Sequence, residues 1–528
     1  MDSARSFSRK RTRILLQDSK SKSNTDSITS LAVSGINNIH SGQRTPQSAA
    51  ERMLSIPELA LLVFKQVSPR TWLTLRLLSR TCDEIVRPHI WRTVSCTTIY
   101  IFRKIWPHIR RNAHYVETLN IKSLPEPCAP NLLREISHLQ TLPNISSLSI
   151  PHIKISLDYL SAILAKMPQL KKIDIRGCIL PKHALEVLAP CKNIESMAFS
   201  HGYVLLSPEY DLNDIFSPWK RLRRLSIAIY PNIGRTSSVK QLEKAMIKSH
   251  LDLESLELGT PRWQARIVAD IIVRNPNLKR LIWNNCALPE HHWVRVLPSL
   301  ANLQSMTFHN TGKHSFEGYL AVILELPSIR HIDLRGFTIE GQDFMDLART
   351  TNTLTSLTLN NCHFESCELR PILDNCTRLE RLQVDELKGS LVIMELFQGR
   401  PWACSNLQEL IFYDIVWASN ERSKRIVAGS LKAMWTTLKG LSRLRVLTLK
   451  HSQRIDPVGL GIHWVGAPSS LEKLHLTGHG SWVQQDVEWI ATHLPRLVEL
   501  ECHNKRMTTT LQSWLKRNRP DVRIIAKS

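Results

Sequence analysis

The hexapeptide LTSLTL, residues 354–359, carries leucine at its first, fourth and sixth positions. The alternation of Leu357, Thr358 and Leu359 is typical of a short β-strand whose leucines face a core while the threonine faces the other side. A strand this short buries little surface by itself. The phrase therefore predicts a fold only if it recurs and its copies stack on one another.

The phrase recurs fifteen times. Its copies begin at residues 116, 145, 170, 194, 222, 253, 278, 303, 329, 354, 379, 407, 444, 471 and 497. Helix-like segments such as residues 263–276 and 316–327 lie between the copies, and the second of them ends at Pro327. Each unit therefore reads as strand, turn and helix, and stacking of the units would bury their apolar edges together in a curved solenoid.

This pattern resembles the leucine-rich repeat, in which the phrase is followed by Asn or Cys. Three copies place a cysteine in that slot, at Cys178, Cys286 and Cys362. The resemblance implies an α/β leucine-rich-repeat solenoid over residues 116–528, with a parallel sheet on the concave face and helices on the convex face. We expect an insertion near 416–443, where residues 421–441 form a lengthened convex helix, and a final capping strand at 519–525.

Residues 51–95 precede the array and contain no copy of the phrase. Pro57 and Pro69 suit the first turns of two helices, and a third helical segment ends on Trp91. Leucines occupy more than one face of these short helices, so we expect part of their surface to meet a partner.

We call residues 51–95 the head block. It resembles the F-box in three segments that follow one another in the same order, namely IPELALLVF (56–64), VSPRTWLTLRLLSRTC (67–82) and IVRPHIWRTV (85–94). The whole chain resembles fungal F-box/leucine-rich-repeat proteins. The resemblance implies a substrate-recognition subunit that docks to a Skp-type adaptor, and through it to a cullin of a ubiquitin ligase, while the repeats hold a protein substrate. The implied adaptor contacts are Ile56, Pro57, Glu58, Leu61, Leu62, Val67, Pro69, Leu75, Leu78 and Trp91. Cys82 differs from the F-box pattern, because many F-box proteins carry a bulky residue near this position.

Two alternatives to this interpretation remain open. The head block could be a plain helical cap on the first repeat, with residues 96–115 as connector and cap in either case. The chain could also be a repeat scaffold for protein–protein interaction that has no ligase role.

Residues 1–50 hold 15 Ser or Thr residues, a composition that predicts a disordered tail. Its basic residues Arg9, Lys10, Arg11 and Arg13 fit a nuclear localisation signal, a transit peptide or a solvated tail. The sequence shows no secretory segment and no apolar run long enough for a membrane span. Eleven scattered cysteines indicate a reducing compartment, so we expect a cytoplasmic or nuclear protein.

No pattern for catalysis is present. The chain has no glycine-rich phosphate loop, and His291 and His292 are adjacent rather than one helical turn apart as zinc ligands would be. Cys362 and Cys367 have no second cysteine pair nearby. We therefore expect a protein that is not an enzyme, with no catalytic residue, no metal and no cofactor.

The net charge of +23 suggests nucleic acid only if the charge gathers on one face. On the expected concave face, the middle position of the strands holds no Lys or Arg. The three outward positions together hold nine bases and seven acids, which argues against a nucleic-acid reader. The expected substrate contacts are Lys172, Asp174, Arg176, Glu257, Arg280, Asp333 and Arg335, facing a partner with basic residues at its centre and acidic flanks. The alternative is a partner bound to the convex insertion near Lys424 and Trp435.

Overall fold

The structure is a computed structural model that describes residue 56 and most of residues 80–527. Within 80–527 it leaves out residues 97, 122–133, 137–141, 153–154, 179–183, 202–215, 230–236, 250, 260–263, 285–289, 311–316, 351–352, 386–390, 393–395, 398–399, 417–423, 452–465, 478–483 and 504–508. The expected tail over residues 1–50 and the first two helices of the head block, within residues 57–79, lie outside the described residues.

One parallel sheet of 18 strands runs through the described part of the chain. The strands are β1 Thr93–Cys96, β2 Thr118–Ile121, β3 Ser147–Ser149, β4 Lys172–Ile175, β5 Ser196–His201, β6 Arg224–Ile229, β7 Ser255–Gly259, β8 Arg280–Asn284, β9 Ser305–His309, β10 His331–Arg335, β11 Ser356–Asn360, β12 Arg381–Asp385, β13 Leu391–Val392, β14 Glu409–Val416, β15 Val446–His451, β16 Lys473–Thr477, β17 Glu499–His503 and β18 Arg523–Lys527. They pair in chain order, except that β12 pairs with β14 and the short β13 pairs with the end of β14. The sheet therefore grows by one strand per repeat.

The strand register follows the repeat phrase. Every one of the fifteen phrases holds a strand, and the strands outside the phrases are β1, β13 and β18. Leu357 of β11 lies between Ile332 of β10 and Leu382 of β12, and all three side chains are buried. Thr358 is only partly buried. The predicted alternation of inward leucine and outward polar residue is confirmed.

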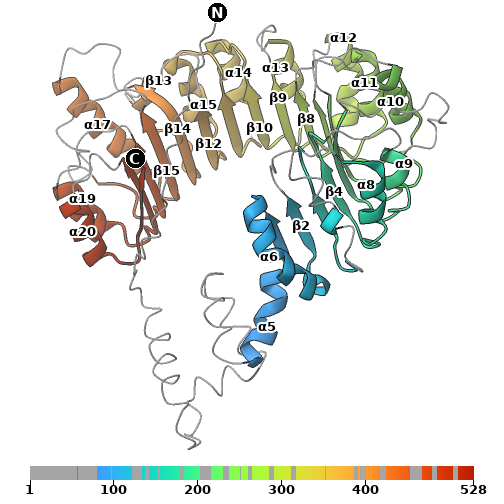
Figure 1. Ribbon diagram of the computed structural model, residues 1–528. Coiled ribbons are helices and arrows are strands. Elements are labelled where there is room, and N and C mark those ends of the chain that lie inside the picture. The colour runs from blue at the N-terminus through green and yellow to red at the C-terminus, as the bar shows by residue number, and fades with distance from the viewer. Residues whose placement is uncertain are drawn as a thin grey trace, which may run out of the picture.

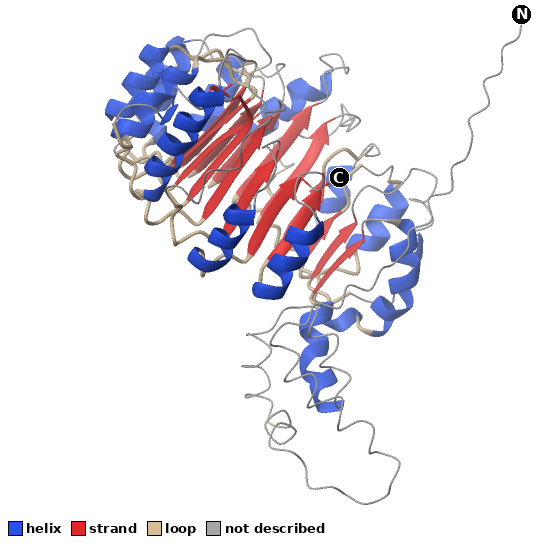
Figure 2. Ribbon diagram, turned by 90° about the vertical axis from the view of Figure 1, so that its left-hand side faces the viewer, coloured by secondary structure: helices blue, strands red, loops and turns tan. Residues whose placement is uncertain are grey.

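Helices cover the side of the sheet away from the hollow of the arch, as Figures 1 and 2 show. After the strands of the repeats come α8 Leu157–Leu164, α9 Ala184–Leu188, α10 Ser237–Lys248, α11 Ala265–Val273, α12 Glu290–Val296, α13 Glu317–Leu324, α14 Gly341–Thr350, α15 Arg370–Asn375, α17 Lys424–Lys439, α19 Gln484–His493 and α20 Thr509–Asn518, with 3-10 turns η3 Leu297–Leu300 and η4 Ser366–Leu369. A parallel sheet lines the concave face and the helices line the convex face, so the expected solenoid is confirmed.

Two helices show how the sequence positions the convex layer. In α13, Leu320 and Ile323 are buried, and the helix ends before Pro327, whose ring is incompatible with a continued helix. In α11 the buried residues are Val268, Ala269, Ile271 and Ile272. Val268 is buried there, whereas Ile267 is only partly buried and packs against the edge of the core.

Cysteine fills the turn after the strand for a structural reason. The thiol of Cys178 donates to the carbonyl of Ile150 at 2.6 Å, and that of Cys362 donates to the carbonyl of Leu334 at 3.4 Å. Both thiols are buried and satisfy a carbonyl of the preceding repeat. The role expected for these two cysteines is confirmed, while Cys286 lies outside the described residues.

The head block joins the solenoid without a linker. Helix α5 covers Arg80–Trp91, and only Arg92 separates it from β1, which pairs in parallel with β2. The sheet thus begins one strand before the first repeat phrase. Helix α6, Ile99–Arg111, then buries Trp106 and Ile109 against the first strands, followed by a 3-10 turn η1 at Ala113–Tyr115.

Candidate functional site

The concave face of the sheet is hollowed between β2 and β8. The hollow has a volume of about 510 Å³. It is lined by Asn120, Ser147, Leu148, Ser149, Lys172, Ile173, Asp174, Arg176, Ser196, Met197, Ala198, Arg224, Leu225, Ser226, Ser255, Glu257, Arg280 and Ile282. We call this site the concave hollow.

The floor of the concave hollow is low because the middle residues of neighbouring strands are small. Ala198 on β5 and Ser226 on β6 lie between Asp174 on β4 and Glu257 on β7. Larger side chains at those two positions would fill the space above the sheet. The depth of the site therefore depends on two residues that carry no charge.

One arginine organises the acidic side of this hollow. Arg176 donates to both carboxylate oxygens of Asp174, with Nε–Oδ1 at 3.0 Å and Nη2–Oδ2 at 2.8 Å. Its Nη1 also lies 3.9 Å from Glu257 Oε2. The hydrogen bond to Asp174 raises the pKa of Arg176 above its usual value. One positive charge thus interacts with two carboxylates.

The same pair recurs six strands away. Arg335 Nε lies 3.1 Å from Asp333 Oδ1, and Arg335 Nη2 lies 2.7 Å from Asp333 Oδ2. Six steps of about 4.8 Å put β10 roughly 29 Å from β4 along the sheet. Asp333 and Arg335 therefore do not line the concave hollow.

The structure brings together five of the seven predicted substrate contacts, namely Lys172, Asp174, Arg176, Glu257 and Arg280. The prediction omitted Arg224, which lines the same hollow. Its position was readable from the sequence, because it occupies the same outward strand position as Lys172 and Arg280.

The aspartates do not form an open acidic row. Asp174 and Asp333 are each paired with the arginine two residues later, which is Arg176 in the turn after β4 and Arg335 at the end of β10. A partner with basic residues at its centre would have to compete with these arginines for the carboxylates. Instead, the charged side chains of the hollow that are not paired with a described residue lie at a neighbouring outward position of the strands.

The alternative recognition element, the insertion helix α17, does not present the tryptophan expected there. Trp435 is completely buried and belongs to the core of the solenoid. The hypothesis of a convex contact at Trp435 is therefore corrected. The helix covers Lys424–Lys439, as its length in the sequence suggested.

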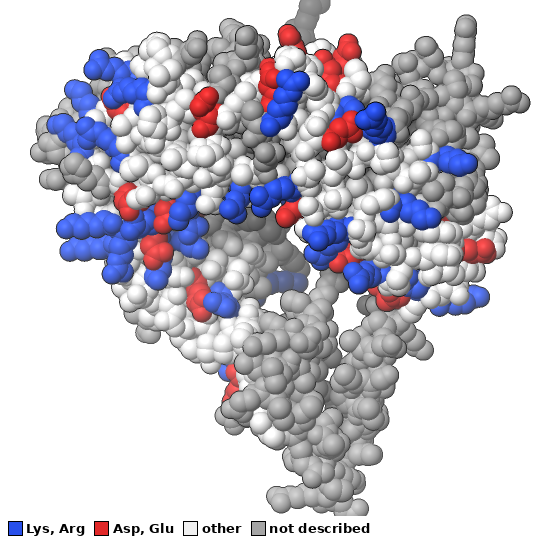
Figure 3. All heavy atoms as spheres, turned by 180° about the vertical axis from the view of Figure 1, so that it is seen from behind, with Lys and Arg blue, Asp and Glu red and all other residues white. Residues whose placement is uncertain are grey.

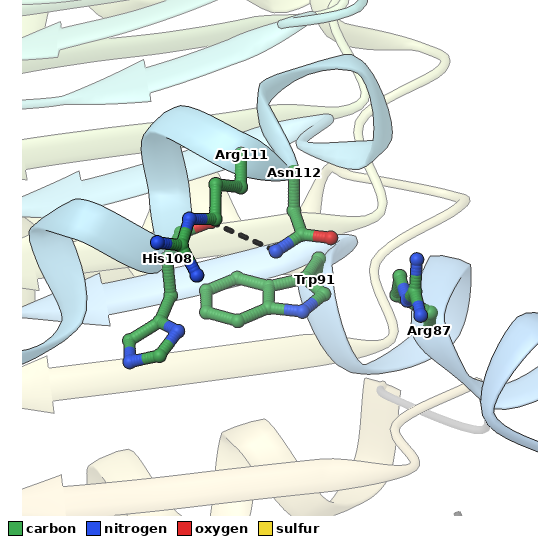
Figure 4. Close-up of a pocket in the computed structure, with 5 residues that line it drawn as sticks. All are labelled: Arg87, Trp91, His108, Arg111 and Asn112. Atoms are coloured by element: carbon green, nitrogen blue, oxygen red, sulfur yellow. Dashed lines mark hydrogen bonds between the residues drawn. The ribbon is translucent and has the colours of Figure 1, made fainter.

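A second, smaller hollow of about 420 Å³ lies where α5 meets α6, lined by Arg87, Trp91, His108, Arg111 and Asn112. Figure 4 shows Trp91 between Arg87 and His108. The rings of Trp91 and His108 are nearly parallel, with centroids 6.3 Å apart. Trp91 therefore already makes a ring contact within the chain, and this contact helps to hold α5 against α6.

Of the ten predicted adaptor contacts, the structure describes Ile56 and Trp91. Ile56 is 46% exposed. The other eight, Pro57, Glu58, Leu61, Leu62, Val67, Pro69, Leu75 and Leu78, lie outside the described residues.

A polar cluster lies on the concave face near the C-terminal end of the sheet. The His475 ring has Nε2 2.9 Å from Glu499 Oε1, and its Nδ1 lies 3.3 Å from Thr448 Oγ1 and 3.6 Å from Glu501 Oε2. These contacts link β15, β16 and β17. Among the residues that the structure describes, no group of three or more His, Cys, Asp or Glu side chains could hold a metal ion.

Charge on the surface is mixed. Figure 3 shows one face of the molecule, where basic side chains gather towards one end and are interspersed with acidic ones across the middle. At the N-terminal ends of the strands, ion pairs such as Lys279–Glu254 and Arg445–Glu472 connect neighbouring repeats. On the face that Figure 3 shows, the described residues form no continuous basic stripe of the kind typical of a nucleic-acid reader.

Strand, turn and helix units stacked in register decide the architecture. The chain folds as a leucine-rich-repeat solenoid. No protein-family model and no curated protein sequence matches it. In the described part of the chain, no helix is both long and apolar enough to cross a membrane.

Solved structures resemble this solenoid at low sequence identity. An internalin, InlF, from Listeria monocytogenes str. 4b F2365 is 14% identical over 75% of this chain and 89% of its own, with a TM-score of 0.35. A leucine-rich-repeat protein from Leptospira interrogans is 15% identical over 79% and 91% of the two chains, with a TM-score of 0.38. TLR13, solved in complex with ssRNA13, is 13% identical over 73% of this chain and 59% of its own, with a TM-score of 0.38.

Proposed function

We propose that this protein is a non-catalytic receptor that binds a protein partner in the concave hollow. The observation that carries the proposal is the hollow itself, a recess with charged side chains on a continuous parallel sheet. Because neighbouring strands are paired residue by residue, the sheet fixes the backbone positions from which these side chains project before a partner arrives. Such pre-organisation lowers the entropic cost of binding.

We further propose that the receptor is the substrate-recognition subunit of a Skp–cullin–F-box ubiquitin ligase. The support is the resemblance of residues 56–94 to the F-box, together with the exposed Ile56. Since only Arg92 separates α5 from β1, an adaptor bound to the head block would be held close to the solenoid. The protein would then act by raising the effective concentration of substrate near the ligase and perform no bond chemistry itself.

The ligase role is tested with the full-length protein and a purified Skp-type adaptor. Replacing Ile56 and Pro57 together with alanine removes two apolar anchors, and we expect a loss of about 2–4 kcal/mol, or roughly 30-fold or more in adaptor affinity. Val294→Ala on α12 is the matched control, because Val294 is 68% exposed and lies far along the chain from the head block. Unchanged adaptor affinity in the double variant would contradict the F-box interpretation.

The full-length protein also distinguishes the ligase proposal from the alternative, a repeat scaffold without a ligase role. Affinity capture of the full chain from cell extract should recover the adaptor and a cullin if the ligase proposal holds. Recovery of protein partners without either would favour a repeat scaffold. The proposal places the protein in the cytoplasm or the nucleus, where its many cysteines stay reduced.

The concave site is tested by reversing charge in the hollow. Lys172→Glu combined with Arg280→Glu should abolish partner capture while adaptor binding persists. Arg274→Glu, an exposed residue at the end of α11 on the convex side, should leave both unchanged. Partner capture that survives the double reversal would place recognition elsewhere.

A further inference from the structure

One outward column of the sheet alternates serine with a basic residue. Strand pairing aligns Ser147 of β3, Lys172 of β4, Ser196 of β5, Arg224 of β6, Ser255 of β7 and Arg280 of β8. All six line the concave hollow. A basic side chain therefore recurs at every second strand, and two strand spacings amount to about 9.6 Å. We call Lys172, Arg224 and Arg280 the basic row.

The charged groups of the basic row are exposed to solvent and are not paired with other described residues. All three side chains are exposed, and none forms an ion pair or side-chain hydrogen bond with a residue that the structure describes. The two acids of the hollow, Asp174 and Glu257, face Arg176 instead. The concave hollow therefore carries an excess of positive charge, concentrated in one straight row.

The open row ends at Arg280. At the same position of β10 stands His331, whose pKa is lowered from its usual value by burial and then by the charge of Arg330. On β12, Arg381 lies 3.2 Å from Glu409 and donates to Gln383 at 2.9 Å. The alternation therefore supplies no further unpaired positive charge between β9 and β12, and the next base of this column, Lys473, lies on β16.

The serines between the basic residues leave room for a chain to lie along the row. Ser196 and Ser255 are short, and their hydroxyls can donate to or accept from the backbone of a ligand. A ligand that crosses the strands would meet a cation, a hydroxyl and a cation in regular order. Such a row selects for the spacing of negative charges along the ligand.

We infer that the basic row binds an extended acidic peptide in the polyproline II conformation, with a carboxylate at every third residue. Three residues of this helix rise about 9.3 Å on one face, close to the ~9.6 Å spacing of the row. Same-face residues of a β-strand repeat at about 6.7 Å, and an α-helix repeats a face at about 10.5 Å over seven residues. Concave curvature brings side-chain tips closer than their backbones, which disfavours the longer α-helical spacing.

A single-stranded nucleic acid fits the site less well. The lining of the concave hollow contains no aromatic ring on which a base could stack. This inference rests on the proposed protein-binding function and names the chemical class of the partner segment.

The test uses the full-length protein and fluorescent peptides of equal net charge. One peptide has four Pro-Pro-Glu repeats, and two comparison peptides carry four glutamates at every second or every fourth residue among prolines. Fluorescence anisotropy should show the first peptide binding about tenfold tighter than the others, because only its carboxylates match the row. Equal affinity for the three spacings would overturn the inference.

Variants locate the binding. Arg224→Glu should weaken the Pro-Pro-Glu peptide by about tenfold or more, whereas Arg274→Glu on the convex side should change its affinity by less than about twofold. Equal losses from both variants, or displacement of the peptide by a tighter-binding oligouridine, would overturn the inference. The spacing series uses the unaltered protein, so it remains decisive even if a variant folds poorly.

The failure of this inference is distinct from the failure of the proposed function. If Lys172→Glu with Arg280→Glu abolishes capture of the natural partner while the three peptides bind equally, the concave site stands and the polyproline II ligand is wrong. If the double charge reversal leaves capture of the natural partner unchanged and the three peptides bind equally, both the concave site and the polyproline II ligand are wrong.

Discussion

The guanidinium of Arg176, in the turn that follows β4, lies 3.9 Å from the carboxylate of Glu257 on β7, so its side chain extends over the two strands between them. Ala198 and Ser226 lie in that row and are short enough to permit it. Because Arg176 also holds Asp174, the acids of the concave hollow are oriented by one residue. The charges left open to a partner are those of the basic row.

The strand register gives a sharp test at two adjacent residues. Leu357 is completely buried, so Leu357→Asp would bury a charge without a partner and should cost on the order of 4 kcal/mol or more. Thr358→Asp faces the concave side and should change the free energy of unfolding by less than about 1 kcal/mol. Urea denaturation and soluble yield measure both. Equal losses would show that the register is wrong by one residue.

Gly336 follows Arg335 in a turn that only glycine fits. Its φ is +76°, and a Cβ there would lie 2.1 Å from the carbonyl oxygen of Asn310. We expect Gly336→Ala to lower the free energy of unfolding by about 2–4 kcal/mol, because the backbone of the neighbouring repeat must move. Gly341→Ala at the start of α14 is the control, since its Cβ would meet nothing closer than 3.4 Å. A comparable loss in the control would refute this explanation.

The buried thiol of Cys362 predicts a loss of stability at high pH. Burial raises the pKa of Cys362 to about 11, above that of an exposed thiol. The folded protein therefore keeps this proton where the unfolded chain has lost it. The resulting stabilisation is complete below about pH 8.5 and is lost as the pH rises towards 11, with a magnitude on the order of 2 kcal/mol.

Cys362→Ala removes this titration. The difference in unfolding free energy between wild type and Cys362→Ala should therefore shrink between pH 8 and pH 10.5 in urea denaturation. Cys367→Ala is the matched control, because Cys367 is exposed and the corresponding difference should not depend on pH. A Cys362→Ala difference that stays constant would sink the prediction.

Arg519 closes the C-terminal end of the solenoid. Its side chain is 13% exposed and donates to the carbonyls of Leu494 and Leu497 at 2.9 and 3.0 Å, while pairing with Asp521 at 2.8 Å. Arg519→Met removes these hydrogen bonds, although the Leu494 carbonyl still accepts from the backbone N–H of Leu497, and should cost about 2–3 kcal/mol. Arg523→Met should cost less than about 0.5 kcal/mol, because Arg523 is 73% exposed and 3.8 Å from Glu499. Faster hydrogen exchange in β18 should accompany only the first change.

The sequence by itself determined the register of the sheet. Alternation with period two sends Leu357 to the core and Thr358 to the concave face, and the phrase repeats this choice in every unit. It also placed Lys172, Asp174 and Arg176 on the concave side. The strand β1 could not be found in this way, since residues 93–96 carry no repeat phrase and form a strand by pairing with β2.

Only the tertiary structure decided which of these residues act together. Arg176 and Glu257 meet because the side chains between them are short, whereas Asp333, with the same local pattern as Asp174, lies far along the sheet. Trp435, which the sequence left on a convex surface, is buried by packing against the core. Local patterns fix the face on which a side chain lies, because each strand alternates. Distances across strands depend on the curvature of the sheet and on the size of residues from other repeats.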